Sequence, residues 1–367
     1  MKGSWPGWGD AIGAFGDLPV MLPLVILLGQ VPGYSLPMLL ASASAASLVA
    51  LWIFRVPVSI QPLKSVAIAA LALGAGSEEI RFSGMILGAF FLVGAVFRKT
   101  PLPVPEPVIR SVQTALGTLL VMQGFRSVSL GPVELALTLL AVTVFYFFDR
   151  RSRLPLLGIA SLMAFIEACV RGRSPTPGVF TLQEGIRGSV LAGLVLPQLA
   201  LTSANSIVGA RLALETYFPD QIQKTGLNLE RRLMASIGAG NVLSGLFHGL
   251  PFCHGAGGIT AHVRSGAHSP VMNGVLALIL GALAWFSART GFVPVLEPRI
   301  GCILLTMIGL HHLNFATPLI RQGRSGWVLL AGSVGLGVGT GNLLYVLGFA
   351  MALHFLENSR TLENAHD

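Results

Sequence analysis

Long apolar stretches make up most of this chain, and short polar loops separate them. A straight helix needs about 20 apolar residues to cross a bilayer, and several of these stretches are shorter. We therefore expect an all-α membrane protein with about fourteen transmembrane segments, some of them interrupted. The predicted segments lie at 15–30, 36–54, 58–74, 82–97, 107–125, 131–148, 154–170, 187–213, 232–248, 252–265, 270–288, 297–312, 326–338 and 341–356.

One predicted segment differs most from an ordinary lipid-facing helix. It is Gly249–Arg264, which reads GLPFCHGAGGITAHVR. It gathers a proline, a thiol, two histidines, an arginine and several glycines, and many of these weaken a helix. The pattern predicts a broken segment, in which an extended stretch ends at Pro251 and a half-helix begins just after it. Unpaired backbone N–H groups at that helix start would point at an anion.

The two halves of the chain share this plan. In each half a polar first segment precedes a third segment that a proline interrupts. Gly16–Pro19 precedes Ile60–Lys64 in the first half, and Leu196–Gln198 precedes Leu250–His254 in the second. Because seven is an odd number of segments, two such halves must sit inverted in the membrane. Paired interrupted segments in two repeats indicate a transporter with its binding site near the midplane.

Inverted repeats would bring the two half-helix starts face to face, one near Gln61–Lys64 and the other near Cys253–Gly257. Glycine has no side chain, so the backbone there can approach a ligand closely. The alternative is two kinked helices that pack through small residues. The expected substrate pocket contains Gln61, Pro62, Lys64, Cys253, His254, Gly255, Ala256 and Gly257.

Lys64 is the only lysine deep inside a predicted segment. A charge at such a place is costly and marks a functional candidate. It would add a full positive charge to an anion pocket. The alternatives are that Lys64 extends to the membrane interface or pairs with Asp17.

The eighth segment carries a row of neutral polar side chains. Gln198, Thr202 and Asn205 follow helical spacing and share one face. Amides and hydroxyls are donors that suit an oxyanion, so we expect these residues in the substrate site. The alternative is that they join neighbouring helices by hydrogen bonds.

Asp17 and His254 are the candidates for proton coupling. Asp17 is the only acid in the first segment, and His254 is a titratable group within the broken segment. Glu167 and the other histidines lie near segment ends, where a titratable side chain needs no functional explanation. A hydrogen-bonded structural role is the alternative for His254, and plain packing is the alternative for Cys253.

The composition agrees with a membrane protein and argues against a soluble domain, a disulfide framework and an enzyme. Apolar residues make up 53% of the chain and charged residues 11%, with a mean hydropathy of +0.73, which leaves no room for a sizeable soluble domain. The three cysteines show neither metal-ligand spacing nor a disulfide framework. No nucleophile–base pair appears within the segments. We therefore expect that the chain is not an enzyme and that it binds no metal or cofactor.

The net charge of +8 is better explained by membrane orientation than by nucleic acid. With the N-terminus in the cytoplasm, fifteen of the 24 basic residues fall on the cytoplasmic side and seven on the other. Both termini are therefore predicted to be cytoplasmic. The short loops suggest a bacterial inner membrane.

Four stretches carry a resemblance to one family. PFCHGAGGITAHVRSGA, from Pro251 onward, looks like the signature of the molybdate transporter type 1 family. Phe15–Pro19 resembles its Gly-Asp-Leu opening, and Ile60–Lys64 its Gln-Pro-Met-Lys element, with Leu63 in place of the methionine. Leu196–Ser206 resembles its Gln-Leu-Pro-Leu-Thr-x-x-Asn-Ser stretch, although here Pro197 precedes the glutamine. The resemblance spans nearly the whole chain.

This family is similar to the sulfate permease superfamily without its C-terminal cytosolic domain, and we expect none here. The resemblance implies a single transporter domain of two inverted repeats, 10–172 and 185–357, in the fold of uracil permease. Segments 1–4 and 8–11 would form a core domain, and segments 5–7 and 12–14 a gate domain. Proteins of this fold often form dimers, so a homodimer is a candidate assembly.

We therefore expect a secondary transporter of molybdate or a related tetrahedral oxyanion, such as sulfate or tungstate, coupled to protons. No nucleotide-binding loop is present, so ATP is not the direct energy source. A nucleobase–proton symporter on the same fold is one alternative, but it would use carboxylates where this chain has Gln198 and Cys253–Gly257. An anion channel on the same scaffold also stays open.

Overall fold

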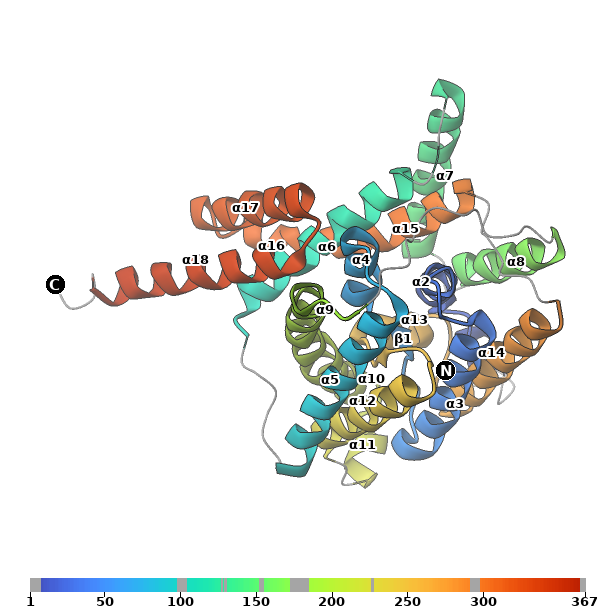
Figure 1. The fold of residues 1–367 in the computed structure, drawn as a ribbon. Coiled ribbons are helices and arrows are strands. Elements are labelled where there is room, and N and C mark those ends of the chain that lie inside the picture. Colours follow the sequence, from blue (N-terminus) through green and yellow to red (C-terminus); the bar gives the residue numbers. More distant parts are fainter. Residues whose placement is uncertain are drawn as a thin grey trace.

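The computed structural model describes residues 8–97, 104–126, 128, 131–151, 155–171, 185–225, 228–290 and 298–363, and these are mostly helical (Figure 1). The first half contains α1 (Trp8–Gly13), α2 (Leu18–Gly29), α3 (Leu36–Phe54), β1 (Gln61–Pro62), α4 (Lys64–Leu73), α5 (Ser77–Phe97), α6 (Glu106–Arg126), α7 (Pro132–Arg151) and α8 (Leu156–Arg171).

The second half has a similar order of elements. It contains α9 (Gly188–Leu201), the π-helix η1 (Thr202–Gly209), α10 (Ala210–Tyr217), α11 (Pro219–Thr225), α12 (Leu229–Leu246), β2 (Phe252–Cys253), α13 (Ala256–Arg264), α14 (Val271–Thr290), α15 (Pro298–Leu313), α16 (Ala316–Ile320), α17 (Arg324–Thr340) and α18 (Leu343–Glu363).

Five helical stretches of the described chain, and not the predicted fourteen, are long and apolar enough to cross a membrane. They are Leu36–Phe54, Ser77–Phe97, Gly188–Tyr217, Val271–Thr290 and Arg299–Ile320. The difference has physical causes. α4 and α13 are half-helices, and four other apolar helices offer only 10–17 residues to a span. α6 has 21 residues, but charged and amide side chains interrupt its apolar run.

The two interrupted segments meet in the middle of the molecule. β1 pairs with β2 in antiparallel register, with Gln61 opposite Cys253 and Pro62 opposite Phe252. The N–H of Leu63 also donates to the carbonyl of Pro251, at 3.0 Å. This short ribbon lies between the helices in Figure 1, and a half-helix leaves from each of its strands. Each predicted break is therefore an extended stretch followed by a half-helix.

Two asparagine side chains act as substitutes for further strands at this ribbon. Asn241 of α12 accepts from the N–H of Phe252 at 2.9 Å and donates to its carbonyl at 2.7 Å. Asn273 of α14 does the same for Val58, at 3.0 and 2.6 Å. All of these groups are buried, where an unpaired backbone amide is costly. The asparagines therefore make extended backbone tolerable in an apolar interior.

Long helices pack around the ribbon in close pairs. α3 lies along α14, α5 along α12, and α6 along α15, as Figure 1 shows. Glycines make two of these contacts close. A Cβ on Gly88 of α5 would lie 2.8 Å from the carbonyl of Gly238 of α12. A Cβ on Gly117 of α6 would lie 2.8 Å from the carbonyl of Gly309 of α15. Such close backbone contact is typical of helices packed in membranes.

The Asn241 pairing yields the first prediction. Asn241→Leu keeps the side-chain volume but leaves the N–H and C=O of Phe252 unpaired. Each unpaired buried group costs about 1–3 kcal/mol, so we expect a loss of about 2–6 kcal/mol in stability. Thermal unfolding of the purified protein in detergent measures this loss.

Ser47→Ala is the matched control. The Ser47 hydroxyl is also buried, but it bonds only to the carbonyl of Ala43 one turn earlier in its own helix. Removing it leaves no backbone group unpaired, so stability should change by less than about 1 kcal/mol. Equal melting temperatures for the two variants would contradict the strand-substitute role of Asn241.

Candidate functional site

The two half-helices begin next to each other because the β1–β2 ribbon holds their first residues together. α4 begins at Lys64 and α13 at Ala256, each directly after its strand. The first backbone N–H groups of a helix have no partner within it, and they carry a partial positive charge. The two starts therefore present donors toward the same central region.

Gln198 of α9 binds one of these starts. Its Oε1 accepts from the backbone N–H of Ser65 at 3.1 Å and from the Ser65 hydroxyl at 2.6 Å. Its Nε2 donates to the hydroxyl of Thr202 at 2.9 Å. Gln198 thus caps α4, and Thr202 holds the amide in place.

A small cavity lies at the half-helix starts. Its volume is about 20 Å³, which is room for about one water molecule. Most of the groups around it are hydrogen-bond donors, and no carboxylate lines it in the described chain. It is lined by Gln61, Lys64, Gln113, Leu116, Gln198, Leu201, Asn205, Ser206, Cys253 and His312.

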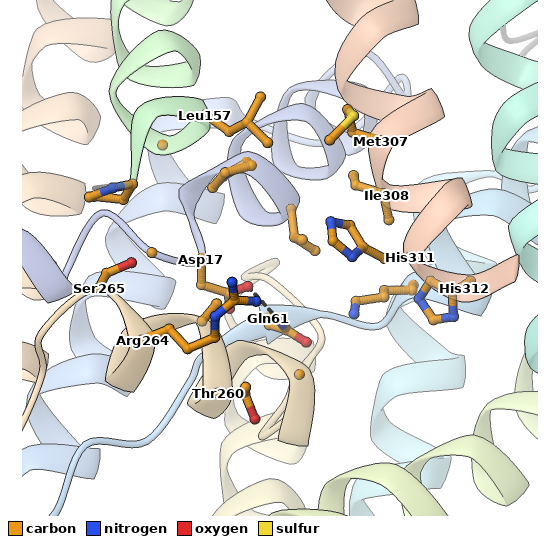
Figure 2. Close-up of a pocket in the computed structure, with 18 of the residues that line it drawn as sticks. Asp17, Gln61, Leu157, Thr260, Arg264, Ser265, Met307, Ile308, His311 and His312 are labelled. Carbon is orange, nitrogen blue, oxygen red and sulfur yellow. Dashed lines mark hydrogen bonds between the residues drawn. The ribbon is translucent and has the colours of Figure 1, made fainter. Parts of the chain in front are cut away.

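A larger cavity of about 330 Å³ adjoins the small one (Figure 2). The two share Gln61, Lys64, Gln113, Asn205 and His312. The large cavity follows one face of α13 from its central start to its far end, where α2, α8 and α15 form the other walls. The α13 residues on this face are Gly257, Thr260, Ala261 and Arg264, and Ser265 follows them.

Asp17 lies in the wall of the large cavity and is joined to the ribbon. The amide of Gln61 donates to Asp17 Oδ1 at 2.6 Å, the dashed bond in Figure 2. The other oxygen, Oδ2, is buried without a hydrogen bond, as is Oε1 of Gln61. Gly258 makes room for this pair, since a Cβ there would lie 2.5 Å from Asp17 Oδ2.

Lys64 faces both cavities and is partly buried. It is near enough to Asp17 for an electrostatic interaction, but no ion pair links Lys64 to a carboxylate in the described chain. The alternative of a direct Lys64–Asp17 bridge is therefore not what this structure shows. The ammonium group is available to an anion in the cavity.

The structure brings only some of the predicted site residues to the cavities. The small cavity is lined by five of them, namely Gln61, Lys64, Gln198, Asn205 and Cys253. The large cavity is also lined by Asp17 and Gly257. The remaining predicted residues line neither cavity, and they are Pro62, Thr202, His254, Gly255 and Ala256.

His254 is held in a structural network beside the site. Its Nδ1 donates to the carbonyl of Ser59 at 2.8 Å, and its Nε2 lies 2.9 Å from the hydroxyl of Ser236. Its ring packs edge-on against Phe54 and Phe252. Both nitrogens are occupied and the side chain is fully buried, which matches the structural alternative for this residue.

Three polar residues that line the small cavity were not among the predicted site residues. Ser206 lies in the polar stretch of the eighth segment, one position after Asn205, and its hydroxyl is buried without a hydrogen bond. His312 could have been noticed as a histidine in an apolar segment, but its place near the segment end made it look ordinary. Gln113 gave a weaker signal, an amide in the middle of an apolar run.

The donors around the small cavity suit an anion. They comprise an ammonium group together with side-chain amides, a hydroxyl, a thiol and an imidazole. Arg264 adds a second cation along the large cavity. No group of three His, Cys, Asp or Glu side chains within the described residues could hold a metal ion.

Comparison with known sequences indicates a family of transporters. The sequence model of a family described as "Molybdate transporter of MFS superfamily" matches residues 9–120 and 190–311. Molybdate transporter 1 of Chlamydomonas reinhardtii is 36% identical over 126 residues, which is 32% of this chain and 24% of that protein. Molybdate transporter 1 of Arabidopsis thaliana is 23% identical over 403 residues, which covers 91% of this chain and 87% of the relative.

The fold is also that of a solved transporter. The transmembrane domain of the cyanobacterial bicarbonate transporter BicA superimposes with a TM-score of 0.62. The match covers 93% of this chain and 97% of that domain, at 17% sequence identity. The chain therefore shares the fold of that domain.

Two neighbouring glycines of α13 give the prediction for this site. Gly258→Ala places a methyl group against Asp17 Oδ2 and the Cβ of Ser59, at 2.5 and 2.7 Å, so the Asp17–Gln61 pair must shift. We expect a loss of about 1–3 kcal/mol in stability, measured by thermal unfolding.

Gly257→Ala is the control on the same helix. A Cβ at Gly257 meets nothing within 4 Å, and alanine favours a helix over glycine by up to about 1 kcal/mol. This variant should be as stable as the wild type or slightly more so. If Gly258→Ala melted at the same temperature as Gly257→Ala, the tight packing at the Asp17–Gln61 pair would be disproved.

Proposed function

The chain belongs to the family described as molybdate transporters of the MFS superfamily, and we propose that it carries molybdate or a related tetrahedral oxyanion, such as sulfate or tungstate, by secondary active transport. Its relatives are transporters and not enzymes. The alignment with the Chlamydomonas relative spans about a quarter of that protein, so substrate and activity are proposals for this chain.

The observation that carries the proposal is the small cavity at the two half-helix starts. The side chains of Lys64, Gln113, Asn205 and Ser206 line it. A nucleobase site of this fold would place carboxylates here, and none lines this cavity in the described chain. Donors in a dry interior favour an anion over water much more than the same donors at a surface.

The architecture we propose is a seven-plus-seven inverted repeat, over 10–172 and 185–357. Its support comes from which helices pack together. In this repeat, α3 and α12 are the second segments of the two halves, and α5 and α14 are the fourth segments. The observed pair α3–α14 therefore has its counterpart in the observed pair α12–α5. In the pair α6–α15 and in the ribbon β1–β2, the two partners are corresponding elements of the two halves. The antiparallel ribbon is what an inverted arrangement requires.

We propose that transport is a displacement of a core domain against a gate domain. The core would contain α1–α5 and α9–α14, and the gate α6–α8 and α15–α18. Both cavities support this division, because their walls come from both sets. Lys64 and Asn205 belong to the proposed core, whereas Gln113 and His312 belong to the proposed gate.

The placement in the membrane is also part of the proposal. The charge bias puts Arg264 and both termini in the cytoplasm, and the large cavity runs along α13 toward Arg264. This conformation would then open inward. The prediction of a bacterial inner membrane rests on the short loops alone, since the two relatives come from an alga and a plant. The homodimer stays a prediction from the family resemblance.

Uptake into proteoliposomes tests the proposed function. Labelled molybdate should enter in a saturable manner, and tungstate and sulfate should compete while uracil should not. Lys64→Met removes a charge-assisted contact worth about 1.5–3 kcal/mol, so the KM for molybdate should rise about 10- to 100-fold. Lys224→Met, at an exposed lysine of α11, is the matched control and should leave the KM unchanged.

Three outcomes would contradict the proposal. Strong inhibition by uracil with none by tungstate would favour a nucleobase symporter. Flux that does not saturate with molybdate would favour a channel. An unchanged KM in Lys64→Met, with the protein folded, would remove Lys64 from the site.

Asp17→Asn tests proton coupling. We propose that the Asp17 carboxylate carries the coupled proton, because its Oδ2 is buried without a partner next to the anion site. An inward proton gradient should stimulate uptake by the wild type, and Asp17→Asn should lose this stimulation while still accumulating label in exchange. Wild-type uptake that is indifferent to an imposed pH gradient would disprove the coupling and leave oxyanion transport intact.

A further inference from the structure

Two helices outside the broken segments also contribute polar groups to the small cavity. Gln113 comes from α6 and His312 from α15, and the side chains are 4% and 9% exposed. Lys64 and Cys253, in contrast, come from the two broken segments. The cavity is therefore enclosed by donors on two independent structural units.

Neither of these side chains is satisfied within the described chain. Nδ1 of His312 is buried without a hydrogen-bond partner. The Gln113 amide makes no hydrogen bond with another described residue. Buried polar groups are almost always hydrogen-bonded, and an unpaired one costs about 1–3 kcal/mol. The Gln113 amide therefore faces the cavity without a partner from the described chain, and the buried Nδ1 of His312 also lacks one.

The packing of α6 against α15 fixes the two side chains relative to each other. A Cβ on Gly117 would lie 2.8 Å from the Cβ of His312, and a Cβ on Gly309 would lie 2.6 Å from the carbonyl of Gly117. Gln113 lies one helical turn before Gly117, and His312 one turn after Gly309. The glycine contact thus carries Gln113 and His312 to the cavity as a rigid pair.

We propose, on the premise of oxyanion transport, that Gln113 and His312 are specificity-determining residues of the substrate site. The Gln113 amide and the His312 Nδ1–H donate to substrate oxygens that face α6 and α15. The half-helix starts and Lys64 serve the oxygens on the other side.

This arrangement selects for shape. A tetrahedral oxyanion has oxygens pointing in all directions, so it can pair with both sets of donors at once. A halide has no oxygens, and nitrate has only three, all in one plane, so each pairs with fewer of these donors at once than a larger tetrahedral oxyanion does. A site built to hydrogen-bond its ligand rejects an analogue that leaves such groups unpaired, by several orders of magnitude in favourable cases. The site therefore favours tetrahedral oxyanions over planar and monatomic ones.

The test compares matched variants in proteoliposomes. Gln113→Met and His312→Leu remove a donor at nearly constant size, whereas His312→Asn keeps an N–H close to the position of Nδ1. Thr306→Val is the control, because the Thr306 hydroxyl is also buried on α15 but lines neither cavity. Labelled molybdate uptake is measured with sulfate, nitrate and chloride as competitors.

Removal of either donor should raise the KM for molybdate about tenfold or more, and should narrow the preference for molybdate over nitrate. His312→Asn and Thr306→Val should stay within about threefold of the wild type. A purely structural role of His312 would lower the amount of folded protein without changing the molybdate-to-nitrate preference. If His312→Leu aggregates, Gln113→Met still tests the proposal, because it removes the other donor of the pair.

The outcomes separate this inference from the proposed function. A wild type that takes up no oxyanion overturns both. A wild type that takes up molybdate, while both donor-removing variants keep its KM and its selectivity, overturns the role of Gln113 and His312 alone.

Discussion

The structure depends on satisfying the backbone of two broken segments inside an apolar interior. Extended backbone exposes N–H and C=O groups that neither lipid nor a hydrophobic core can pair. Here the β1–β2 ribbon pairs the two breaks with each other, and Asn241 and Asn273 pair the backbone of Phe252 and Val58. Each half of the chain thus depends on the other, because neither break could be buried alone.

This solution has a chemical consequence. The ribbon satisfies the strands but leaves the helix starts that follow them uncapped. Gln198 caps the start of α4 through Ser65, and the other donors face the cavities. The feature that makes the breaks stable is therefore also the one that concentrates positive potential at the centre. The proposed anion site uses backbone that folding has already ordered, so little further ordering would be needed when an anion binds.

The sequence predicted the breaks well, because proline and glycine have local effects that do not depend on the rest of the fold. Pro62 and Pro251 mark the ribbon, and the half-helices begin at Lys64 and Ala256. Residues that reach the site through helix crossings were harder to predict. Gln113 and His312 line the same cavity because α6 and α15 touch at Gly117 and Gly309, far apart in the sequence. His254 looked like a ligand within its motif, and only the three-dimensional contacts with Ser59 and Ser236 show why its nitrogens are occupied.

The two cavities together indicate how such a site must work. The small cavity, at about 20 Å³, has room for a water molecule but not for a tetrahedral oxyanion, although the donors around it suit one. The walls must therefore separate when the substrate enters. Glycine contacts make α6 and α15 one unit, and the ribbon makes the two broken segments another. Separation between these units enlarges the cavity without breaking either one. The same displacement draws Gln113 and His312 away from Lys64, so an anion that bridges the two units limits how far they separate.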